Sequence, residues 1–288
     1  MSGDRSNNDI FSGGAPGDRA KMTGMPVRNT MKDDFGLDIP TELVPLPSGG
    51  KVYGPDSPLH GQEAVEIRPM TAREEDILTS RALIKKGTVI TELIRSCLVD
   101  KRIDPDKLVS GDRNAIMTSL RITGYGSDYS VDVECPNCTE KSKQCFDLTQ
   151  LPLKMLEKDP VNTGENLFTY TLPFTKKVIK YKFLDGSDEN QISKLQERSK
   201  KSGTKNSNAI TLIYRFQIQA VGDITDKTKI QMFIRNMPAK DSRALRKHID
   251  GIEPGIQMKA WMECPHCGED SEVRMPLGAS FFWPDADG

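Results

Sequence analysis

ECPNC at residues 134–138 and ECPHC at residues 263–267 are the two stretches that decide the fold of this chain. Each Cys-Pro-x-Cys turn, here called a knuckle, follows an alternating, strand-like run. Two residues between the cysteines let both sulfurs turn toward one ion. Four soft, anionic ligands suit zinc in a closed tetrahedral site. The sequence therefore predicts a structural zinc that joins two distant parts of the chain, with the ligands Cys135, Cys138, Cys264 and Cys267.

Other cysteine chemistry stays open as an alternative. A redox Cys-x-x-Cys pair usually lies at a helix start, whereas both knuckles follow strands, so we favour zinc over a redox pair, an iron–sulfur cluster or a reduced, metal-free cluster. The second knuckle continues into Gly268, which permits the turn, but the first continues into Thr139. The remaining candidate ligands are expected elsewhere: Cys97 in the core, Cys145 on the return strand and His266 toward solvent.

Composition excludes several classes of function. The 288 residues carry a formal net charge of -1, which does not favour a protein that coats DNA. No apolar stretch reaches the roughly 18 residues of a membrane span, and the polar N-terminus has no signal-peptide core. Cysteines in close pairs then indicate a reducing compartment. Neither a phosphate-binding glycine loop nor a catalytic histidine setting occurs in the sequence, so we expect no enzyme.

Outward from the knuckles, the pattern predicts an α+β fold of helical blocks and short β-hairpins. We expect a disordered arm over residues 1–41, because they are polar and lack apolar periodicity. Residues 42–160 then form an α+β unit with the first knuckle. Residues 161–288 contribute a hairpin, further helices and the second knuckle.

The expected elements follow from local signals. Thr71 and Glu74 fit a capping box at a helix start, and Gly87 fits the end of that helical block. Alternating aromatic and aliphatic residues predict a hairpin with strands near residues 168–172 and 179–183. Further helices are expected over residues 88–98, 112–123, 187–202, 226–237 and 242–249, and over 209–220, where a strand is the alternative.

A weak internal repeat emerges from these elements. Arg113 precedes Cys135, and Arg243 precedes Cys264, at nearly the same spacing and through the same order of helix, turn, strand and knuckle. Two similar units, packed about a pseudo-twofold axis with the ion between them, would explain that pattern.

The C-terminal aromatic run is a candidate partner contact. Successive side chains of a strand point to opposite faces, so three consecutive aromatic residues cannot all face one core from a single strand. At least one ring is then exposed, covered by another part of this chain, or covered by another protein. The residues concerned are Phe281, Phe282 and Trp283.

Further runs of the sequence lie at residues 46–53, 67–78, 84–88, 121–126, 135–138, 237–243 and 281–284, and the most specific is Arg68-Pro69-Met70-Thr71-Ala72-Arg73-Glu74-Glu75-Asp76. In these runs the chain resembles the baseplate hub proteins of T-even-like contractile-tail bacteriophages. The resemblance implies a non-enzymatic protein of hub assembly, present in the host cytoplasm during assembly and either retained in the virion baseplate or acting as a chaperone. Its partners would be other hub proteins or the tape-measure protein, with Arg73, Glu74 and Asp76 as additional contact residues. A zinc-ribbon protein that binds nucleic acid is the alternative.

Overall fold

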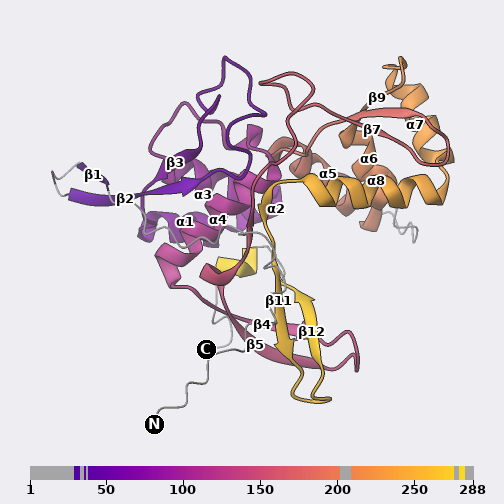
Figure 1. The fold of residues 1–288 in the computed structure, drawn as a ribbon. Helices are drawn as coiled ribbons and strands as arrows, with labels where there is room; N and C mark the ends of the chain where they lie inside the picture. The colour runs from indigo at the N-terminus through magenta and orange to yellow at the C-terminus, as the bar shows by residue number, and fades with distance from the viewer. Residues whose placement is uncertain (1–28, 33–35, 37, 202–208, 276–278, 283–288) are drawn as a thin grey trace, which may run out of the picture.

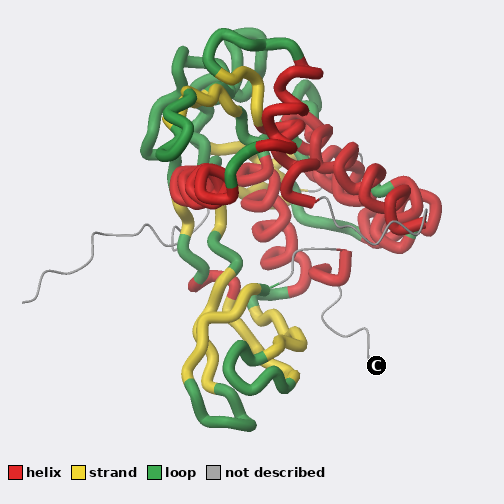
Figure 2. The backbone as a smooth tube through the Cα atoms, turned by 90° about the vertical axis from the view of Figure 1, so that its right-hand side faces the viewer, coloured by secondary structure: helices red, strands yellow, loops and turns green. Residues whose placement is uncertain are grey.

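The computed structural model describes residues 29–32, 36, 38–201, 209–275 and 279–282. The fold is α+β, as expected, with five small antiparallel sheets of two or three strands among these residues. Most of the described chain forms a helical body, and two hairpins project from it side by side (Figure 1). A second view, turned by 90°, shows the same division between helices and projecting strands (Figure 2).

The first half of the body begins with three antiparallel strands, β1 (Asn29–Lys32), β2 (Asp38–Pro45) and β3 (Ala64–Ile67). Four helices follow, α1 (Ala72–Thr79), α2 (Arg81–Lys86), α3 (Val89–Cys97) and α4 (Ser110–Tyr125). The capping box is present at Thr71, and α2 ends at Gly87, whose φ of 70° is left-handed. The local signals thus place the two outer ends of this segment correctly, but they predicted a single helix, and the structure divides it at Ser80, which caps the start of α2.

The second half also contains a three-stranded sheet and four helices, but its third strand follows two of the helices. Strands β7 (Phe168–Thr171), β8 (Val178–Tyr181) and β9 (Ile218–Val221) form a second three-stranded sheet. The helices are α5 (Gly186–Lys201), α6 (Ala209–Gln217), α7 (Lys227–Asn236) and α8 (Ala239–Ile252). The pair β6 (Leu153–Lys154) and β10 (Gly255–Ile256) bridges the two halves, and the buried hydrophobic cluster contains side chains from both.

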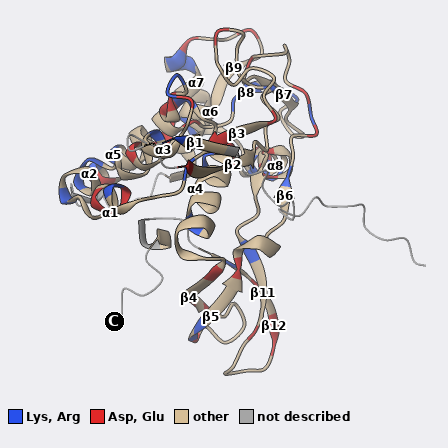
Figure 3. Cartoon of the chain, turned by 90° about the vertical axis from the view of Figure 1, so that its left-hand side faces the viewer, with Lys and Arg blue, Asp and Glu red and all other residues tan. Residues whose placement is uncertain are grey.

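Each half ends in one projecting hairpin. The first is β4 (Asp128–Glu134) with β5 (Lys141–Asp147), and the second is β11 (Lys259–Glu263) with β12 (Asp270–Arg274). Three single turns of 3-10 helix complete the described elements, η1 (Pro105–Lys107), η2 (Leu148–Gln150) and η3 (Ala279–Phe282). Lys and Arg as well as Asp and Glu lie on both hairpins (Figure 3).

Two buried aspartates support the internal repeat. Asp112 in α4 and Asp241 in α8 each lie at the same distance in sequence before the first cysteine of their knuckle. Asp112 accepts a hydrogen bond from the backbone N–H of Ser48 at 2.8 Å, and Asp241 accepts one from Phe174 at 2.7 Å. Both donors directly follow a Leu-Pro pair, at residues 46–47 and 172–173. The two halves therefore share this contact between a Leu-Pro turn and a buried aspartate, although the order of their strands and helices differs.

Three expectations about local structure need correction. The arm expected over residues 1–41 includes strand β1 and the start of β2, which pair in register, while residues 1–28 lie outside the described part. The segment 209–220 is a helix followed by a strand, because α6 ends at Gln217 and β9 joins the edge of the second sheet. Arg113 and Arg243 are also unlike, since Arg113 is buried and Arg243 is exposed.

Candidate metal centre

The two knuckle turns have the same backbone geometry. In the first, the N–H of Cys135 donates to the carbonyl of Glu140 at 2.9 Å, and the N–H of Thr139 donates to the carbonyl of Cys135 at 2.9 Å. In the second, Cys264 donates to Glu269 at 3.1 Å, and Gly268 donates to Cys264 at 2.8 Å. Each hairpin thus presents its two cysteines from one turn of fixed shape.

The fold brings the four predicted ligands together. All four Sγ atoms lie within 4.8 Å of one another. The pairs that join the two knuckles are Cys135 with Cys267, at 3.9 Å, and Cys138 with Cys264, at 3.6 Å. Zinc bound by thiolates at about 2.3 Å in a tetrahedron requires sulfurs roughly 3.8 Å apart. These sulfurs therefore fit a tetrahedral metal site.

The surroundings favour thiolate at two of the ligands. Backbone N–H groups of Cys138 and Asn137 lower the pKa of Cys135 to about 6. The backbone N–H of Glu269 and the side chain of Asn137 lower the pKa of Cys267. The Asn137 amide donates across the gap between knuckles, with its nitrogen 3.6 Å from the Cys267 sulfur. Donors held by one knuckle thus stabilise negative charge on both.

The thiol of Cys138 shows what a cation would add to this centre. The backbone N–H of Glu140 favours the thiolate of Cys138, but burial and the hydrogen bonds of neighbouring thiols outweigh it and raise the pKa of Cys138. A divalent cation at the centre reverses this balance, because it attracts all four sulfurs. Four protein ligands fill a tetrahedron, so such a site stabilises structure and leaves no open position for a substrate.

The other sulfur and nitrogen candidates lie where the sequence predicts. Cys145 is on the return strand β5 and exposed, and His266 is exposed inside the second knuckle. Cys97 is fully buried, and burial raises its pKa to about 12. None of these three belongs to the four-sulfur cluster.

The predicted contact residues at the start of α1 divide into two kinds. Arg73 and Asp76 are exposed, so they stay available to a partner. Glu74 is fully buried, which corrects the expectation that it lies on the surface. Its carboxylate accepts hydrogen bonds from Arg68 at 2.6 and 3.1 Å, from Ser96 and from Thr71. Burial opposes the charged carboxylate, but these bonds outweigh it and lower the pKa of Glu74 to about 2.

The C-terminal aromatic run also needs correction. Residues 279–282 form the 3-10 helix η3, so the alternation of a strand does not apply. Phe281 and Phe282 are both fully buried. The ring of Phe281 packs edge-on against Tyr129 at 5.0 Å, and its carbonyl accepts a hydrogen bond from Arg121 at 3.1 Å. These two rings therefore belong to the core, and Trp283 lies outside the described residues.

A contact candidate that the sequence did not single out is Trp261. Its side chain is 72% exposed on β11, beside the ion pair of Lys259 with Glu272 at 3.0 Å. Successive side chains of a strand point to opposite faces, so the sequence alone does not say whether Trp261 or its neighbour Met262 faces the core. The structure shows that Met262 is buried and Trp261 is exposed. The second knuckle hairpin thus carries an exposed aromatic ring, three residues before its first cysteine.

Fold and site together define an α+β protein of two similar halves, each bearing one knuckle of a shared cysteine centre. A family model described as T4 bacteriophage base plate protein matches residues 40–283, so the chain belongs to that family. No curated protein and no solved structure matched the chain. No helix in the described ranges is long and apolar enough to cross a membrane.

Proposed function

We propose that the chain is a structural protein of the phage baseplate that acts in assembly of the hub, either as a hub component or as an assembly chaperone. The observation that carries this proposal is the family match over residues 40–283, which covers both halves and both knuckles. A structural role agrees with a centre whose four protein sulfurs complete a tetrahedron. We also propose that zinc is the bound ion, since thiolate ligands in this geometry suit it best.

The part of the zinc in this function would be to hold the projecting hairpins together. Contacts between the hairpins are sparse, and each is a two-stranded sheet, which has little stability of its own. One ion bound to both turns would fix their relative position. The exposed ring of Trp261 would then be presented to a partner on a rigid support.

Other baseplate proteins are the partners that this proposal implies. Aromatic residues most often anchor protein interfaces, so we propose Trp261 as a contact, with Arg73 and Asp76 as a second contact on α1. Hub and tape-measure proteins are the specific candidates. The proposed location is the host cytoplasm during assembly, followed by the tail baseplate.

The test is a phage in which this gene is interrupted, compared with the same phage supplied with the intact protein. The proposal predicts incomplete baseplates without a hub, restored by the intact protein. Complete baseplates in its absence would contradict the proposal. Mass spectrometry of purified virions beside infected-cell lysate separates the two forms, because a hub component stays in the particle and a chaperone does not.

Binding to nucleic acid is the competing function. A protein that contacts several phosphates binds duplex DNA with an affinity that falls steeply as salt rises. Such binding by the zinc-loaded protein, at an affinity unaffected by Trp261→Ala, would favour that alternative over a baseplate role.

A further inference from the structure

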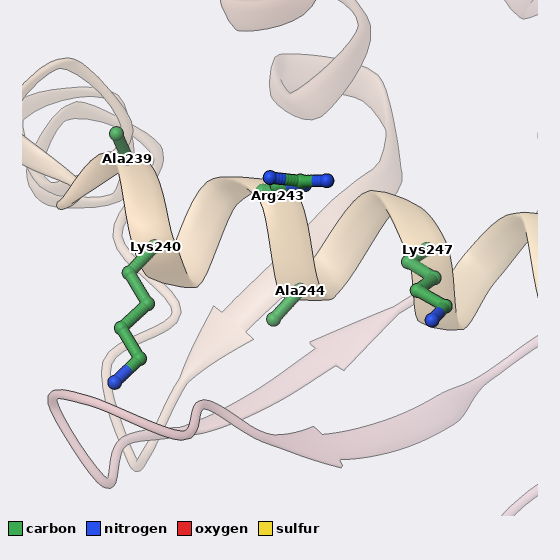
Figure 4. A pocket seen from close by; sticks show the side chains of 5 residues that line it. All are labelled: Ala239, Lys240, Arg243, Ala244 and Lys247. Atoms are coloured by element: carbon green, nitrogen blue, oxygen red, sulfur yellow. The ribbon is translucent and has the colours of Figure 1, made fainter.

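The exposed side of α8 carries a stripe of positive charge. Lys240, Arg243 and Lys247 follow one another at the spacing of successive helical turns, with Ala239 and Ala244 beside them (Figure 4). All three cationic side chains are exposed, and Ala239 and Ala244 line the same shallow depression. At about 1.5 Å of rise per residue, the three charges span roughly 10 Å along the helix.

No ion pair within the described residues neutralises this stripe. Some exposed cations of the described residues do have such partners, for example Arg102 with Asp100 at 2.8 Å, and others, such as Lys194, have none. The acidic residue nearest in sequence, Asp241, is buried, and its two oxygens accept the backbone N–H groups of Phe174 and Thr175 at 2.7 and 3.0 Å. The positive charge of the stripe is therefore open to an external partner.

The turn between β7 and β8 lies beside the start of α8. Asp241 binds this turn to the start of α8, and Lys240 points toward it (Figure 4). The turn adds two exposed lysines and the ring of Phe174, which is 62% exposed. We name the combined surface the α8 basic face, and its members are Phe174, Lys176, Lys177, Lys240, Arg243 and Lys247.

We propose that the α8 basic face binds an acidic segment of a partner protein. Charge complementarity selects an anionic partner, and the apolar components select protein over nucleic acid. Alanines let a partner backbone come close enough for its carboxylates to reach cations on both sides. An exposed phenylalanine at one end offers an apolar anchor of the kind found in protein interfaces. The chain as a whole has a net charge of -1, so it lacks the general attraction to DNA that a basic protein has.

A binding experiment with a defined probe tests this surface, and its outcome does not depend on the baseplate proposal. The probe is a fluorescent alanine-based helical peptide with glutamates every third or fourth position on one side, and binding is followed by anisotropy. Arg243→Glu/Lys247→Glu should weaken binding about tenfold or more, since two attractive contacts become repulsive. The matched control is Lys194→Glu/Arg198→Glu, which reverses one lysine and one arginine four positions apart on the exposed side of α5. It should stay within about twofold of the unmodified protein.

Three results would overturn the proposal. In the first, the unmodified protein fails to bind the peptide at millimolar concentration. In the second, both double variants weaken binding of the peptide equally. In the third, a duplex DNA probe binds more tightly than the peptide, and Arg243→Glu/Lys247→Glu abolishes the binding of DNA. Thermal unfolding of both variants shows whether they are folded. If the test variant unfolds, Arg243→Gln/Lys247→Gln replaces it, with Lys194→Gln/Arg198→Gln as control, and the same ranking of affinities is required.

Discussion

Thr139 and Gly268 occupy the same position in the two knuckle turns and share a left-handed backbone, with φ of 62° and 72°. Each donates its N–H to the carbonyl of the first cysteine of its knuckle. A β-branched residue is strained in this conformation, whereas glycine is not. The first knuckle therefore keeps the geometry of the second at a cost in stability.

The two single substitutions Thr139→Gly and Gly268→Thr should change the free energy of unfolding in opposite directions. Thr139→Gly should raise the free energy of unfolding by about 0.5 kcal/mol, because relief of strain exceeds the greater entropy of the unfolded chain. Gly268→Thr should lower it by about 1 kcal/mol. Urea denaturation of the metal-loaded proteins measures both values. A loss of stability in Thr139→Gly as large as that in Gly268→Thr would show that the Thr139 side chain makes a needed contact.

The buried carboxylate of Glu74 should make the protein sensitive to acid. Its pKa is about 2 in the folded protein and near 4.5 when unfolded, so its contribution is fully present above pH 4.5 and is lost as the pH falls toward 2. The shift corresponds to about 3 kcal/mol at neutral pH. Glu74→Gln should therefore be less stable at pH 7, and its difference from the unmodified protein should shrink below pH 4.5. If the difference in free energy of unfolding stays constant with pH, the charge of Glu74 does not stabilise the fold. Loss of metal in acid affects both proteins alike, so it cancels in this difference.

Trp261→Ala should separate binding from stability. Because the ring is 72% exposed, its removal should change the melting temperature little, while truncation of an interface anchor costs roughly 2 kcal/mol of binding free energy. Co-purification with the other baseplate proteins of the phage measures the loss. Met232→Ala, at a side chain 61% exposed on α7, is the control and should bind normally. Equal binding by both variants would remove Trp261 from the interface.

Phe282→Ala should destabilise the fold. Phenylalanine in a core contributes about 3–5 kcal/mol relative to alanine, and Phe282 is fully buried against Phe281, with ring centroids 5.6 Å apart. Phe174→Ala, at an exposed ring, should change the free energy of unfolding by less than about 0.5 kcal/mol. Chemical denaturation compares the two. A fully stable Phe282→Ala protein would mean that η3 does not pack in solution as it does in the structure.

The sequence predicts those parts of the fold that depend on neighbours along the chain. Cysteine spacing locates the four ligands, and Thr71 with Gly87 locates helix ends, because caps and turns are local. The burial of Glu74 could not be predicted, since its hydrogen-bond partner Ser96 comes from another helix. The sequence left open whether Phe281 contacts a partner or its own chain, because its packing depends on Tyr129 and Arg121, which lie far away in sequence.

If one metal ion joins the two halves, the purified protein should contain stoichiometric zinc. Elemental mass spectrometry of protein never exposed to chelator should give one zinc per chain. Cys135→Ser, Cys138→Ser, Cys264→Ser and Cys267→Ser should each lower this content and destabilise the fold, because metal binding contributes on the order of 10 kcal/mol to folding in small metal domains. Cys145→Ser, outside the cluster, should keep its zinc. Less than half an equivalent of zinc in the unmodified protein, or an unchanged zinc content in the four knuckle variants, would show that the two knuckles do not share a bound zinc ion.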